Sequence, residues 1–196
     1  MTLRSLAVLV LAAGLAACGG TAAEEAPPPS PPATLATPTL AASALPELNV
    51  QTRLLDADAL VADAFVPEPL ARLLGDAGDV VGSEREFFGR SDIFDHVIAR
   101  SLRFESGDGG AAYLGWVRTH PRDFLGRAKR EPALGLGEEE ALFSLLRCDV
   151  CKKQQPTFLA VWRRGESVGF LLASGAGVKR ETFAALARQL DERIGP

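Results

Sequence analysis

Three apolar runs near the carboxyl end constrain the fold of this chain more than any other feature. They cover residues 141–148, 157–163 and 167–174, and short polar segments separate them. The shortest of these segments, Arg164-Gly165-Glu166, is typical of a hairpin turn. The pattern therefore predicts three consecutive strands of an antiparallel sheet.

An amphipathic helix is expected after the third run. Gly175 and Gly177 interrupt the strand pattern, and apolar side chains then recur at helical spacing over residues 179–194. Gly195 stands directly beyond, where a helix commonly ends. The apolar positions are Phe183, Leu186, Ala187, Leu190 and Ile194. One face of this helix is expected to pack on the sheet.

Three shorter helices are expected in the preceding half of the chain. Residues 56–65 and 67–74 have the composition of short helices, and Pro67 fits a first helical turn. Residues 111–119 are also predicted to be helical. The side chains expected to face the sheet from this last helix are Ala112, Trp116 and Val117.

A fourth strand is expected over residues 96–105, where Ile98, Leu102 and Phe104 fall on one side. A glycine-rich turn, residues 106–110, follows it. Strands with one apolar face and a terminal amphipathic helix predict an α+β fold. We expect an antiparallel sheet of about four to five strands, covered by helices, with the amphipathic helix at the carboxyl end.

Residues 18–46 are expected to form a disordered tether. Alanine, proline, threonine and serine dominate there, and prolines in series favour an extended, semi-rigid spacer. The alternative interpretations of this segment are a ligand for proline-binding modules and a site for O-linked sugar on Thr34, Thr37 and Thr39. Residues 47–196 then leave about 150 residues, the usual size of one domain, and we expect a single α+β domain there.

The amino terminus carries the features of an export signal. Arg4 precedes an apolar stretch over residues 6–15, which is shorter than the roughly 20 apolar residues of a membrane-spanning helix. Leu15-Ala16-Ala17-Cys18 follows and resembles a bacterial lipobox. The resemblance implies that residues 1–17 are a signal peptide and that the Cys18 thiol carries lipid. It places the chain on the cell membrane or outer membrane, anchored by lipid and facing outside the cytoplasm. A plain signal peptide is the alternative.

Cys148-Asp149-Val150-Cys151 is the other chemically distinctive feature. Outside the cytoplasm two nearby thiols tend to oxidise, so a Cys148–Cys151 disulfide is the leading interpretation. A thioredoxin-like redox pair is an alternative, as are a metal site and haem attachment.

The composition weighs against several classes of function. A formal net charge of −4 argues against nucleic-acid binding, which requires a basic face. No local motif such as GxSxG marks a nucleophile, and we expect no catalytic residues, no cofactor and no metal site. A basic stretch near Trp116 is interpreted as a solvated surface or as a contact to anionic polymer or headgroups. Its residues are Arg118, His120, Arg122, Arg127, Lys129 and Arg130.

Short segments spread over most of residues 47–196 form a recognisable order. They are Arg85-Glu86-Phe87, Ala99-Arg100-Ser101-Leu102-Arg103-Phe104, Gly110-Ala111-Ala112, Gly137-Glu138-Glu139-Glu140-Ala141, Trp162-Arg163-Arg164-Gly165 and Leu186-Ala187-Arg188-Gln189-Leu190. This order resembles uncharacterised bacterial envelope lipoproteins and, more loosely, the extracellular sensor domains of mycobacterial serine/threonine kinases. The resemblance implies a binding or accessory function at the cell surface, and it assigns no site residues.

Three hypotheses for function follow. The leading one is a membrane-anchored, non-catalytic binding or accessory domain for an envelope partner or a small amphiphile. The second is an extracytoplasmic thiol-disulfide protein that works through Cys148 and Cys151. The third is a structural cell-surface protein that packs against wall polymer. A roomy pocket with apolar lining would favour a ligand-binding domain over a surface that only packs.

Overall fold

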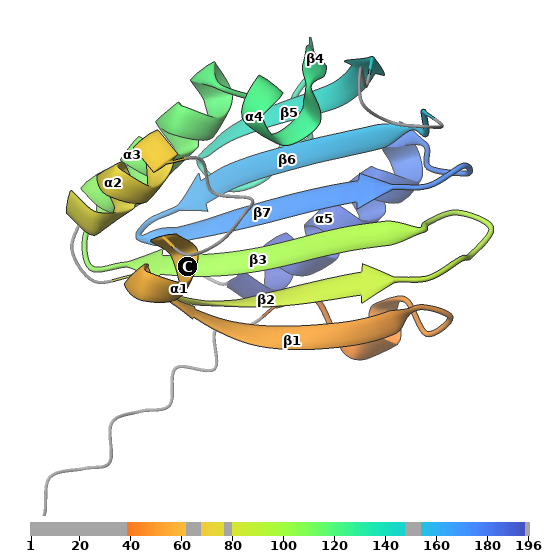
Figure 1. The fold of residues 1–196 in the computed structure, drawn as a ribbon, viewed down its shortest axis with the longest axis horizontal. Helices are drawn as coiled ribbons and strands as arrows, with labels where there is room; N and C mark the ends of the chain where they lie inside the picture. The colour runs from red at the N-terminus through yellow and green to blue at the C-terminus, as the bar shows by residue number, and fades with distance from the viewer. Residues whose placement is uncertain (1–38, 62–67, 77–79, 148–153, 195–196) are drawn as a thin grey trace, which may run out of the picture. The chain divides into compact units, whose positions relative to one another are not determined.

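A central antiparallel sheet organises the computed structural model, which describes residues 39–61, 68–76, 80–147 and 154–194 (Figure 1). The strands are β1 Asn49–Asp56, β2 Val80–Phe88, β3 His96–Phe104, β4 Arg127–Glu131, β5 Glu139–Arg147, β6 Thr157–Arg164 and β7 Ser167–Ser174. The helices are η1 Ala42–Ala44, α1 Ala57–Val61, α2 Glu68–Asp76, α3 Gly107–Thr119, α4 Arg122–Leu125 and α5 Arg180–Ile194. Within these residues, seven strands form one sheet in the order β1-β2-β3-β7-β6-β5-β4.

The α+β class, the antiparallel sheet and the terminal helix are confirmed, but the expected number of strands was too low. β1, β2 and β4 were missed. β2 contains the polar run Gly82-Ser83-Glu84-Arg85-Glu86, which has the composition of a loop. It forms a strand because its charged groups find partners on β1 and β3, as with Arg53 and Glu84. β1 is exposed along almost its whole length and therefore shows no alternation.

The elements with strong patterns lie where they were expected. β6 and β7 form a hairpin in which Arg164 pairs with Ser167, and Gly165 takes the left-handed backbone conformation that the turn requires. α5 buries the predicted apolar positions. α1 covers part of the helix predicted over residues 56–65, and Asp56 caps it by accepting a hydrogen bond from the Ala59 N–H at 2.7 Å.

The buried face of α3 differs from the expected one. Val117 is buried as predicted, but Ala112 and Trp116 are only half-buried, and Tyr113 and Leu114 take the core positions. The cause lies at the start of the helix. A Cβ at Gly109 would collide with the ring of Phe104, so the two glycines there let the helix approach the sheet closely and set its rotation.

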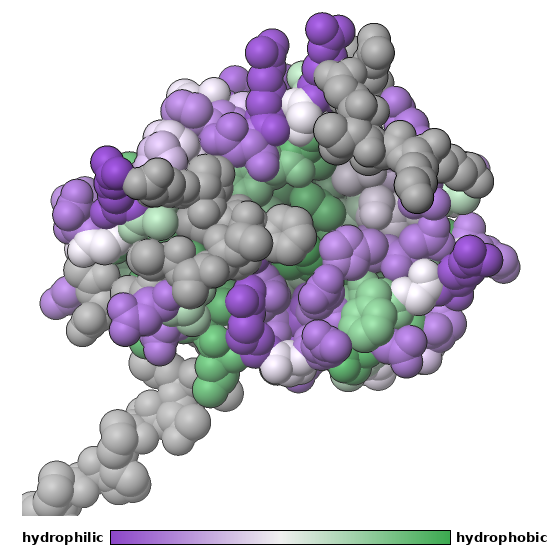
Figure 2. Space-filling view, in the orientation of Figure 1, coloured by the Kyte–Doolittle hydropathy of each residue, from purple (hydrophilic) through white to green (hydrophobic). Residues whose placement is uncertain are grey.

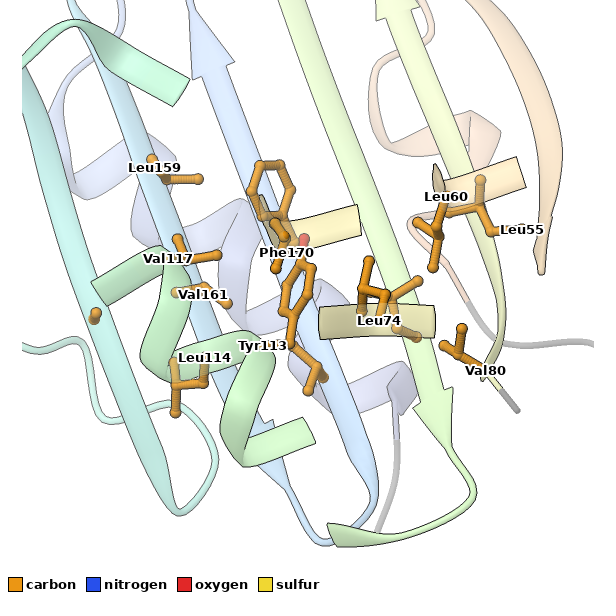
Figure 3. Packing of buried hydrophobic residues seen from close by; sticks show 14 of the residues in the cluster. Leu55, Leu60, Leu74, Val80, Tyr113, Leu114, Val117, Leu159, Val161 and Phe170 are labelled. Atoms are coloured by element: carbon orange, nitrogen blue, oxygen red, sulfur yellow. The ribbon is translucent and has the colours of Figure 1, made fainter. Parts of the chain in front are cut away.

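Helices cover both faces of the sheet. α2, α3 and α4 lie on one face, named here the α3 face, and α5 lies on the other, the α5 face (Figure 1). On the α3 face, Tyr113, Leu114 and Val117 pack over Val161 and Phe170 of the neighbouring strands (Figure 3). Successive residues of a strand point to opposite faces, so the same strands also supply the second core.

The α5 face is built around Trp162, which is fully buried. A Cβ at Gly169 would overlap the Trp162 indole, so only glycine fits on the neighbouring strand. Leu40 and Leu45 also belong to this core, although composition assigned residues 39–46 to the tether. The packed part of the chain therefore includes the segment that directly precedes β1.

Candidate functional site

An open pocket of about 560 Å³ lies between α2 and the amino end of α3. Its volume falls in the range of roughly 300–1,000 Å³ that is usual for small-molecule sites. Pocket residues from α2 are Pro69, Arg72, Leu73 and Asp76, and those from the start of α3 are Ser106, Asp108, Gly109 and Ala112. Figure 2 shows this face, where hydrophilic residues predominate over α2 and α3 and hydrophobic residues gather in the hollow beside α4.

The amphipathic pattern of α2 positions its half of the pocket. Leu70 and Leu74 are fully buried against the sheet, one turn apart. Arg72 and Asp76 therefore project from the opposite, exposed side of the helix. Leu73 lies between these two sides, half-buried, and gives the pocket part of its apolar wall.

The first turn of α3 forms the other half. Ser106 is the cap residue, with extended backbone, and its side chain makes no capping hydrogen bond. The N–H groups of a first helical turn have no partners within the helix and carry a partial positive charge. Asp108 lies in this turn and places a carboxylate at the same rim. The turn thus combines backbone donors, a hydroxyl and an acid.

The lining is chemically mixed. Pro69, Leu73 and Ala112 offer an apolar wall, while Arg72 brings a cation and Asp108 an anion. Among the residues that the structure describes, the lining holds no histidine and no cysteine. What it offers is an apolar wall for the body of a small molecule and charged groups for its polar end.

A second polar cluster lies inside the sheet and was not predicted. Arg100 on β3 is 1% exposed, donates to the Glu84 carboxylate and lies 5.3 Å from the centre of the Phe170 ring. Glu84 also accepts a hydrogen bond from Arg53 on β1 at 2.9 Å. The carboxylate is thus held by guanidinium groups from the strands on either side. Its evident role is to join β1, β2 and β3.

Another pair extends this row of charges along β2 and β3. His96 Nε2 lies 2.7 Å from the Glu86 carboxylate, and both side chains are half-buried. One position in the sequence does indicate this row of charges. Arg100 stands between Ile98 and Leu102 in the alternation that predicted β3, at a position where an apolar residue is expected.

The predicted basic stretch spreads over the end of α3, α4 and β4. Two of its cations are in ion pairs, Arg118 with Glu139 at 3.7 Å and Lys129 with Glu131 at 3.1 Å. His120 stacks on Trp116 with ring centres 3.7 Å apart. These contacts favour a solvated surface over a dedicated anion site.

Two carboxylates near this stretch have perturbed acidity. A hydrogen bond from Arg163 at 2.8 Å holds the pKa of Glu139 below its usual value, and the same contact raises the pKa of Arg163. A hydrogen bond from the Ser144 hydroxyl at 2.7 Å, with Lys129 nearby, lowers the pKa of Glu131. Both acids therefore stay ionised to lower pH than an isolated carboxyl.

The cysteines assigned from the sequence, Cys18, Cys148 and Cys151, all lie outside the described residues. The lipid anchor and the disulfide therefore stay predictions, as does the redox alternative. In the part of the chain that the structure describes, no group of three or more His, Cys, Asp or Glu could hold a metal ion. No helix among those residues is long and apolar enough to cross a membrane.

Comparison with known proteins gives a likeness of fold only. No protein-family model matches the chain, and no curated protein matches it. Among solved structures, the extracellular domain of PknH from Mycobacterium tuberculosis is similar at 9% sequence identity and a TM-score of 0.45. The similarity covers 74% of this chain and 82% of that one.

Proposed function

We propose that this chain is a membrane-tethered binding domain of the bacterial envelope, and that it holds a small amphiphile in the pocket between α2 and α3. The observation that carries the proposal is the pocket itself, about 560 Å³ in volume, with one apolar wall and a charged rim. Such a lining matches a ligand that has an apolar body and a polar end.

Two kinds of contact, apolar burial and charge attraction, would hold the ligand in the pocket. Burying the apolar body against Leu73, Pro69 and Ala112 supplies affinity, at roughly 25 cal/mol for each Å² removed from water. Arg72 and Asp108 then fix the orientation of the polar end, because each attracts only one sign of charge. Selectivity is therefore expected to depend on the headgroup more than on the apolar body.

The tether and its anchor supply the location. Diacylglycerol on Cys18, with a further acyl chain on the new amino terminus, would hold the protein firmly, since one chain alone anchors only marginally. A proline-rich spacer over residues 19–38 would reach on the order of 60 Å if fully extended, at about 3.1 Å per residue. A domain on such a spacer can sample ligand well away from the lipid surface.

The pocket is tested with the fluorescent amphiphile 11-(dansylamino)undecanoic acid, whose emission rises on transfer to an apolar environment. We expect saturable binding of one probe per chain. Ala112→Trp fills the pocket and is expected to weaken binding at least tenfold. Ala111→Trp is the matched control, because Ala111 is the exposed neighbour and does not line the pocket. Equal binding by the two variants, with both folded by circular dichroism, would refute the proposal.

The anchor is tested by replacing Cys18. The wild-type chain is expected to incorporate labelled palmitate and to fractionate with membranes, because acyl chains hold it there. Cys18→Ala is expected to lose the label while the domain keeps its thermal unfolding transition. Labelling that persists in Cys18→Ala contradicts lipidation at this residue.

A further inference from the structure

The β1 edge of the sheet is open to another strand. Among the described residues, β1 pairs on one side only, with β2, from Asn49 opposite Phe88 to Asp56 opposite Val81 without a register shift. The strand has no proline and no bulge. The outer row of N–H and C=O groups on an edge strand is a template for pairing with a further strand.

The side chains of β1 also lack cover on the α5 face. Val50, Thr52 and Leu54 point to this face, as the hydrogen bond between Thr52 and Arg85 shows. Leu54 is 77% exposed and Val50 is 38% exposed, so two large apolar groups stand in solvent on one edge strand. On the α3 face the strand carries Gln51 and Arg53, of which Arg53 is paired with Glu84.

We propose that β1 pairs antiparallel with β1 of a second copy of this chain, in a register centred on Thr52. A two-fold axis perpendicular to the sheet produces antiparallel strands and keeps each face continuous across the pair. Directly opposite residues must then lie on the same face. Around Thr52, Val50 lies opposite Leu54 of the partner, and Leu54 lies opposite Val50 of the partner. The exposed apolar groups of the two copies cover each other.

Neighbouring registers fit less well. A register centred on Arg53 sets two guanidinium groups directly opposite each other, which is destabilising. A register centred on Gln51 moves Leu54 of each chain beyond the paired part of the strand. In the register centred on Thr52, Gln51 on the α3 face instead lies opposite Arg53 of the partner. A neutral group then stands beside a cation. The residue pattern of β1 is thus self-complementary in one register.

The amino ends of the two copies are compatible with this pairing. The Thr39 hydroxyl donates to the Ala99 carbonyl, and the Thr39 carbonyl accepts from Arg193 of α5, so the chain enters the domain on the α5 face. Because the two-fold axis preserves the faces, both copies receive their chains from the same side of the joined sheet. Two tethers can then lead to one membrane, a point that rests on the proposed anchor. The pairing itself does not depend on the pocket.

Cysteine cross-linking tests the register in the full chain purified in detergent. Thr52→Cys is expected to form a disulfide-linked dimer on mild oxidation. Gln51→Cys is the matched control, since its own copy lies diagonally across at roughly 7–8 Å, at or beyond the Cα separation that a disulfide tolerates. Val50→Cys and Leu54→Cys are expected to cross-link only when the two variants are mixed, and mass spectrometry identifies the joined peptides. Absence of the mixed product, or equal cross-linking of Gln51→Cys, overturns the register.

Light scattering tests the dimer itself. The purified protein is expected to show twice its monomer mass at high concentration and to dissociate on dilution. Leu54→Lys is expected to remain monomeric. Val81→Lys is the control and is expected to keep the dimer, because Val81 is also exposed, at 40%, but belongs to β2. A wild-type chain that is monomeric at every concentration, or a Leu54→Lys chain that still dimerises, overturns the proposal.

Discussion

The two edge strands of the sheet, β1 and β4, differ in whether a further strand can pair with them. β4 has 5 residues and its register shifts between Arg127 and Ala128, whereas β1 has 8 residues in unbroken register. β4 also carries three cations and is followed by Pro132. Short length, irregular pairing, charge and proline all discourage the addition of another strand. One edge is therefore closed to pairing, and the other is available for it.

The charges of the two edges are also placed differently. On the β1 side the carboxylate of Glu84 lies within the sheet, beside the buried Arg100. On the β4 side Lys129 is 61% exposed, and its partner Glu131 is half-buried, with 15% of its side chain exposed. The buried charge near β1 joins strands to one another, while the cations of β4 face water. The predictions below test this contrast.

The largest effect is expected from Glu84→Gln. The change removes the carboxylate charge of Glu84 beside the buried Arg100 guanidinium, and breaking a buried ion pair in this way typically costs about 3–5 kcal/mol of stability. Arg53→Gln is the control, because Arg53 is partly exposed and its pair should contribute about 0–1 kcal/mol. Urea unfolding of both variants measures the two losses. Equal losses would mean that burial of the pair does not matter.

An intermediate effect is expected along β1 itself, where Leu54 and Leu55 point to opposite faces. Leu55 is 2% exposed and belongs to the core, so Leu55→Ala should cost about 2–5 kcal/mol. Leu54→Ala should change the stability of the monomer by no more than about 0.5 kcal/mol. Thermal unfolding at a concentration that keeps the chain monomeric compares the two. A costly Leu54→Ala would show that this side chain is covered within one chain.

The smallest effect is expected at the β4 edge. Glu131→Gln removes an ion pair whose lysine is exposed, and it should cost about 1 kcal/mol or less at neutral pH. Because the Ser144 hydrogen bond lowers the pKa of Glu131 from 4.5, the folded state binds this proton less readily than the unfolded state. The contribution is therefore present above pH 4.5 and is lost as the pH falls through the lowered pKa.

Unfolding of wild-type and Glu131→Gln chains in a pH series measures that loss. The difference in stability between the two chains should be constant above pH 4.5 and should shrink below it. Ser144→Ala removes the main hydrogen-bond donor to Glu131. In a chain that carries Ser144→Ala, the loss of stability caused by Glu131→Gln should therefore be smaller. A difference that grows toward acid pH would contradict the assigned cause.

The same contrast explains which parts of the fold could be predicted from the sequence. β3, β5, β6 and β7 have buried apolar faces, and α5 repeats its apolar positions over four turns, so each has a local pattern. The edge strands lack such a pattern because solvent covers most of their side chains. β2 lacks it because its central polar residues are satisfied by partners far along the chain.

The pocket could not be predicted for a related reason. Arg72 lies in a helix that was expected, whereas Asp108 was assigned to a turn and lies in the first turn of α3, and nothing in their own sequence neighbourhoods marks them as a pair. They line one pocket because α2 packs beside the amino end of α3. The close approach that Gly109 permits depends in turn on Phe104 in the preceding strand. Packing of this kind is decided by the whole fold.

The two tryptophans stand on opposite sides of the sheet. Trp162 is sealed against Gly169 beneath α5, whereas Trp116 is half-buried on α3 and stacks on His120. An indole sealed from water emits at shorter wavelength than one that water reaches, and a stacked imidazole can quench its neighbour. The chain consequently carries a separate optical reporter for each helical layer. Time-resolved emission can show whether α5 and α3 leave the sheet together or one after the other during unfolding.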